Sequence, residues 1–85
     1  MQFLICTYDK KGEAFTNPVA TPKKALAVRD FAEVCKDEKH PFHKYPEDYS
    51  MWTVGEFNEI TGEITPKKEK IAEAINFVIK KDDKK

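Results

Sequence analysis

The chain has 85 residues, of which 40% are hydrophobic and 35% are charged, so we expect one small domain with a modest core. Its 15 basic and 15 acidic side chains give a formal net charge of +0, which argues against a protein that coats DNA through a general basic surface. No apolar run is long enough to span a bilayer, and the apolar start over residues 1–6 lacks the basic flank of a signal peptide. Cys6 and Cys35 fall inside predicted regular structure, which favours buried thiols in a reducing compartment over a disulfide.

The first predicted element is a strand over residues 2–8. Both of its faces are apolar, which is typical of a central strand that is covered on both sides. A hairpin turn follows, in which we expect Asp9 to accept a bond from its own backbone and Gly12 to adopt a positive φ. The return strand over residues 13–15 should end at Asn17-Pro18, because proline cannot donate to a strand ladder.

The next element is a helix, with Thr21 as its N-cap and Pro22 at its first position. It should end near Asp37, before His40-Pro41. Its apolar arc contains Ala25, Ala27, Val28, Phe31, Ala32, Val34 and Cys35. Leu26 falls outside this arc, among charged residues.

The second half of the chain repeats this order of elements. A polar loop over 37–49 leads to a strand over 50–57, a turn from Asn58 to Gly62 and a short return strand over 63–65. Thr65-Pro66 then opens a second predicted helix, whose buried residues would be Ile71, Ala72, Ile75, Val78 and Ile79. The result is an α+β domain over residues 1–80 with the order ββαββα, followed by a charged tail over 81–85. Two hairpins would form an antiparallel sheet with both helices packed on it.

Paired lysines at the two predicted helix starts are the first candidate binding site. Lys23 and Lys24 follow one Thr-Pro pair, and Lys67 and Lys68 follow the other. Cations in the first turn oppose the helix dipole, whereas free N–H groups beside lysines can hold a phosphate. The four lysines are therefore either a nucleic-acid contact or a solubilising surface.

Aromatic and apolar residues outside the core pattern supply two more candidate surfaces. Phe42 and Tyr45 lie in the predicted polar loop, where they would either stack on unpaired bases or anchor the loop. Leu26 and Phe77 lie off the apolar arcs of the two predicted helices, which raises the prospect of a dimer or partner surface.

The sequence offers little support for an enzyme. His40 and His43 lie in a loop near Cys35, Glu47 and Asp48, but their spacing is not that of a metal site. No combination of acid, base and nucleophile stands out, so we expect no catalytic residues, no metal and no cofactor.

One continuous stretch of the chain, residues 43–62, carries a recognisable signature. It reads HKYPEDYSMWTVGEFNEITG, and the matching residues are His43, Pro46, Glu47, Asp48, Tyr49, Met51, Trp52, Val54, Gly55, Phe57, Asn58, Thr61 and Gly62. The signature resembles that of the small nonstructural protein of gokushovirus-type microviruses, which are bacteriophages with single-stranded DNA genomes. This resemblance implies an accessory protein in the host bacterial cytoplasm, with weak single-stranded DNA binding in genome replication or packaging. The alternative is a protein-interaction module or homodimer that binds a phage capsid, replication or host protein, and neither reading involves a membrane.

Overall fold

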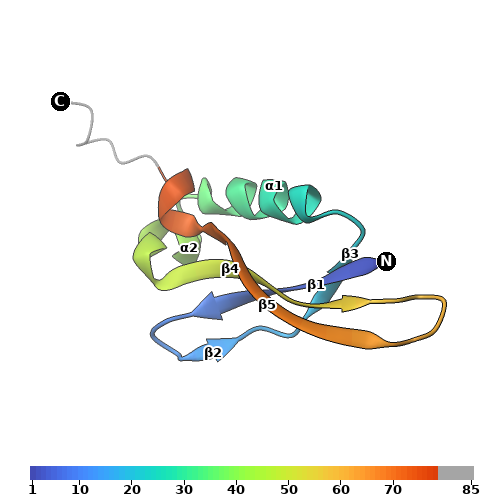
Figure 1. Ribbon diagram of the computed structural model, residues 1–85. Helices are drawn as coiled ribbons and strands as arrows, with labels where there is room; N and C mark the ends of the chain where they lie inside the picture. The colour runs from blue at the N-terminus through green and yellow to red at the C-terminus, as the bar shows by residue number, and fades with distance from the viewer. Residues whose placement is uncertain (79–85) are drawn as a thin grey trace.

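The computed structural model describes residues 1–78, which form one antiparallel sheet with helices packed against it (Figure 1). In chain order the elements are β1 (Gln2–Asp9), β2 (Ala14–Phe15), β3 (Val19–Thr21), α1 (Lys24–Cys35), α2 (Pro41–Lys44), η1 (Pro46–Asp48), β4 (Tyr49–Phe57), β5 (Ile64–Glu73) and η2 (Ala74–Phe77), where η marks a 3-10 helix. The α+β class and the antiparallel sheet are confirmed. The predicted order ββαββα is not, because the second α-helix, α2, lies in the segment predicted to be a polar loop. Ile79 and the predicted tail over 81–85 lie outside the described residues.

The sheet is built around β1 and β4. Its strand order is β2-β1-β4-β5, and β3 pairs with β1 as well. The predicted central place of β1 is confirmed, and Ile5 and Cys6, which point to opposite sides, are both buried. The expected cover on both faces is not found within residues 1–78, where the helices lie on one face of the sheet.

A proline divides the strand that pairs with the free edge of β1. β2 pairs with the end of β1, and β3 pairs with its beginning. Between them the Thr16 N–H donates to the Thr7 carbonyl at 2.8 Å, and the Thr16 hydroxyl accepts from the Thr7 N–H at 2.9 Å. Pro18 has no N–H to continue the ladder, so the predicted end of the strand at Asn17-Pro18 is confirmed.

The two predicted turns are present, with one difference. Asp9 Oδ1 accepts from the Lys11 N–H at 3.0 Å, as expected, but the positive φ of 55° belongs to Glu13 and not to Gly12. In the second turn Asn58 Oδ1 accepts from the Ile60 N–H at 2.9 Å, and Gly62 has a φ of 80°. This turn places β5 beside β4.

The prediction of a second long helix at Thr65 is wrong. Residues 64–73 form β5, a ten-residue strand paired with β4, and in the part of the chain that the structure describes a single 3-10 turn follows it. The run from Lys67 to Lys70 suits a helix by local propensity, but a helix there would leave the outer edge of β4 unpaired. Pro66 is tolerated because β5 is an edge strand.

The helices also begin at other residues than expected. Thr21 ends β3, and α1 begins at Lys24 with Lys23 as an N-cap that makes no side-chain capping bond. The predicted polar loop contains α2, where His40 Nδ1 accepts from the Phe42 N–H at 3.1 Å and Pro41 occupies the first turn. His43 Nδ1 donates to the Cys35 carbonyl at 2.9 Å, so both histidines help to hold this segment.

The main core lies between the sheet and the helices. Its buried members are Ile5, Phe31, Cys35, Met51, Ala72 and Ala74. Figure 1 shows α1, α2 and η2 on the same side of the sheet, so within residues 1–78 no helix lies over the opposite face.

Candidate nucleic-acid interface

The sheet face opposite the helices carries a row of three aromatic rings. Register brings them together, since Tyr8 pairs with Phe15 and Cys6 pairs with Trp52 on the neighbouring strand. The rings of Tyr8 and Phe15 lie 4.7 Å apart between centroids, and those of Phe15 and Trp52 lie 5.9 Å apart, edge to face. These contacts hold the three rings in fixed positions.

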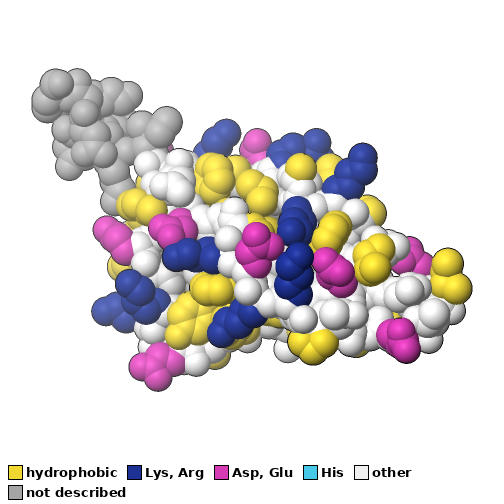
Figure 2. All heavy atoms as spheres, viewed as in Figure 1, with side chains coloured by type: hydrophobic (Ala, Val, Ile, Leu, Met, Phe, Trp, Pro, Cys, Tyr) yellow, Lys and Arg dark blue, Asp and Glu magenta, His cyan; other side chains and the backbone are white. Residues whose placement is uncertain are grey.

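Two lysines of β5 lie over these rings. Lys68 Nζ is 5.1 Å from the ring centroid of Phe15 and 5.5 Å from that of Trp52, and Lys70 Nζ is 5.9 Å from that of Trp52. Residues two apart on a strand share a face, which is why both lysines reach the rings. We call the set Tyr8, Phe15, Trp52, Lys68 and Lys70 the stacking face. In Figure 2 hydrophobic side chains lie between Lys and Arg side chains over the part of the sheet near β2.

The rings of the stacking face are accessible to different degrees. Phe15 is 37% exposed, whereas Tyr8 and Trp52 are half-buried. The Trp52 indole N–H donates to the Ser50 hydroxyl at 2.8 Å, which fixes the orientation of the ring. An incoming base would meet an ordered surface.

The two lysines differ in their charge partners. Lys70 forms an ion pair with Glu73 at 2.6 Å, and this hydrogen bond and charge lower the pKa of the Glu73 carboxyl. Within residues 1–78, Lys68 has no ion pair and is held only by the rings. Lys68 is therefore the better placed of the two for a phosphate.

The structure does not bring the four predicted lysines together as two helix starts. Lys67 and Lys68 lie on β5, so the predicted phosphate site at a second helix N-terminus is wrong. Strand alternation sends Lys67 to the other side, where its Nζ is 3.9 Å from Glu56. Lys24 also has partners within the protein: its Nζ lies 3.2 Å from Glu69 Oε1 and 5.1 Å from the ring centroid of Phe3.

The other predicted contacts divide into exposed and packed residues. Tyr45 is 57% exposed and Leu26 is 37% exposed, as expected. The ring centroid of Phe42 lies 5.3 Å from that of Phe31 and 4.6 Å from that of Tyr49, which supports the interpretation that Phe42 anchors its loop. Phe77 is half-buried against the core, 6.1 Å from Phe31, so its expected place on an exposed helix face is wrong.

Sequence reasoning missed most of the stacking face. Of its members only Lys68 was a predicted contact, because Trp52 fits a core position and Lys70 fits a helix. The available signal was the spacing of Lys68 and Lys70, which places both on one face only if the segment is a strand.

The comparisons with known proteins agree with the signature. The family model described as "Phage ORF5 protein" matches residues 2–77, nearly the whole described fold. The chain belongs to this family. The ORF5 relative from Chlamydia phage 1, "Protein ORF5", is 31% identical over 78 residues, which covers 87% of this chain and 81% of the relative. The resemblance to a small nonstructural protein of gokushovirus-type microviruses is thereby confirmed.

One further comparison and two observations concern the structure. No solved structure matches this ORF5 chain. Over residues 1–78, no helix is long and apolar enough to cross a membrane, and no group of three or more metal-binding side chains occurs. The protein is a phage accessory protein of the ORF5 family.

Proposed function

We propose that this ORF5 protein binds single-stranded DNA weakly through its stacking face and acts in replication or packaging of the phage genome in the host cytoplasm. The observation that carries the proposal is the row of three rings with lysines above them. Unpaired bases stack on aromatic side chains whatever the nucleotide sequence, and cations beside the rings contact the phosphates. A paired duplex hides its base faces, so the ligand class is single-stranded.

In the proposed mechanism a base replaces a lysine over a ring. Lys68 lies over Phe15 and Trp52 in the free protein, and it would turn outward to a phosphate as the base stacks. Such an exchange loses a cation–π contact of about 0.5–1 kcal/mol for an exposed pair, while each stacked base contributes about 1–3 kcal/mol. The net gain is small, and the formal charge of +0 adds no general attraction, so we expect weak binding.

The test is a titration with a labelled oligothymidine at low salt, followed by fluorescence anisotropy. Trp52 is the only tryptophan of the chain, so its emission reports directly on the stacking face. Phe15→Leu should weaken binding about tenfold, because it removes one stacking ring. Lys68→Gln should also weaken binding and should flatten the slope of log affinity against log salt by about 1.

Lys39→Gln is the matched control, since Lys39 is an exposed lysine outside the stacking face. This variant should bind DNA like the natural chain. Thermal melting verifies that each variant is folded. An unchanged anisotropy and an unchanged Trp52 emission at low salt, in folded protein, would refute the proposal.

A further inference from the structure

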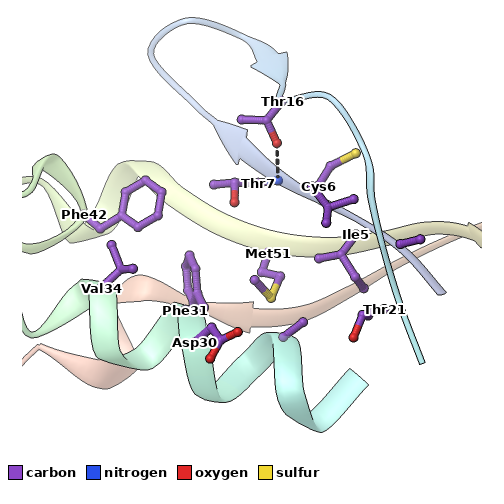
Figure 3. Close-up of a pocket in the computed structure, with 13 residues that line it drawn as sticks. Ile5, Cys6, Thr7, Thr16, Thr21, Asp30, Phe31, Val34, Phe42 and Met51 are labelled. Carbon is purple, nitrogen blue, oxygen red and sulfur yellow. Dashed lines mark hydrogen bonds between the residues drawn. The ribbon is translucent and has the colours of Figure 1, made fainter. Parts of the chain in front are cut away.

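A groove of about 380 Å³ opens between α1 and the edge of the sheet formed by Thr16 and β3. Its floor reaches the core, because Ile5, Phe31 and Met51 line it and each is less than a tenth exposed. Figure 3 shows Phe31 rising from α1 toward Met51, with Asp30 beside it. The groove is apolar and is separate from the stacking face.

The rim of the groove carries exposed apolar residues. Val19 lines it from β3 and is 66% exposed. On α1, Leu26 is 37% exposed; it does not itself line the groove but precedes the lining residue Ala27 in the chain. The molecule thus presents an apolar hollow beside an apolar projection, which is what a self-complementary surface requires.

The same side of α1 carries one positive and one negative charge. Lys23 is its N-cap and Asp30 lies seven residues later, which is two turns along nearly the same line of the helix. Neither side chain has an ion pair within residues 1–78. A cation at the N-cap is unfavourable toward the helix dipole, and an approaching carboxylate would offset this.

We propose that this surface is a homodimer interface, in which two copies of α1 pack antiparallel about a two-fold axis between Leu26 and Ala27. In that register Lys23 meets Asp30 of the partner subunit, and the partner's Lys23 meets Asp30, because both pairs are equally far from the axis. Leu26 then covers the groove of the partner subunit. The occupant is a second copy because a two-fold axis places the apolar projection of each copy on the hollow of the other and sets unlike charges opposite each other. The two stacking faces stay uncovered in the dimer, since they lie on the sheet face opposite α1.

Analytical ultracentrifugation over a range of micromolar concentrations tests this interface. Asp30→Lys places like charges at both symmetric contacts and should weaken the dimer about tenfold or more. Lys23→Asp should weaken it to a similar extent. The double variant exchanges the two charges, restores both pairs and should recover the dissociation constant to within about threefold.

Two controls separate dimerisation from folding. Lys23→Asp introduces a favourable N-cap, so its melting temperature should rise while its dimer weakens. Arg29→Asp changes the charge of an exposed α1 residue that does not line the groove, and it should leave the dimer intact. A natural chain that stays monomeric at every concentration, or a double variant as weak as the single ones, would overturn the proposal.

Discussion

Thr53 lies in the middle of β4 and is fully buried, yet its hydroxyl has no hydrogen-bond partner among residues 1–78. It pairs with Ile5 on one side and Glu69 on the other. A buried hydroxyl without a partner costs about 1–3 kcal/mol relative to the hydrated group. Thr53→Val keeps the shape of the side chain and removes this cost.

We therefore expect Thr53→Val to raise the free energy of unfolding by about 1 kcal/mol. For a domain of this size the melting temperature should rise by roughly 4 to 8 °C. Urea unfolding followed by Trp52 fluorescence measures the same change, and its m-value should not move.

Thr53→Ser is the matched comparison. It keeps the hydroxyl and removes the methyl group, so it should lower the free energy of unfolding by about 1 kcal/mol through lost burial and a small cavity. Opposite signs for the two variants are the critical result. If Thr53→Val were destabilising by a similar amount, the hydroxyl would have to be hydrogen-bonded, and the reasoning would be refuted.

Two further predictions concern close packing and the thiols. Gly55→Ala should lower the free energy of unfolding by about 1–2 kcal/mol, because a Cβ there would lie 3.0 Å from the Thr65 carbonyl oxygen. Gly12→Ala would meet only the flexible end of Asp9 and should change stability by less than about 0.5 kcal/mol in the same urea titration. Burial raises the pKa of both the Cys6 and Cys35 thiols, so iodoacetamide at pH 8 should alkylate the folded chain at least about tenfold more slowly than the urea-unfolded chain. Because burial raises the pKa of these thiols, they stabilise the fold below their unfolded pKa, and this contribution is lost as the pH rises from the unfolded pKa through the raised folded pKa. Equal alkylation rates in the folded and the unfolded chain would show that the thiols are exposed.

The sequence by itself determined the features that depend on neighbouring residues. The strand β1 follows from its apolar pattern, and the break between β2 and β3 at Pro18 follows from the missing proline N–H. The turn from Asn58 to Gly62 follows from a side-chain acceptor and a glycine with positive φ. The α+β class and the phage family could also be predicted, since the signature over 43–62 is continuous in the chain.

Only the tertiary structure decided the conformation of residues 64–73. Their local propensity and their Thr-Pro start favour a helix, but pairing with β4, which recurs from Ile64 to Glu73, satisfies backbone groups and outweighs that preference. The consequence reaches the candidate site, because alternation along a strand divides Lys67 from Lys68 and brings Lys68 over Phe15. Rings from three strands form one surface only through their register, and no local pattern specifies register between segments that are distant in the chain.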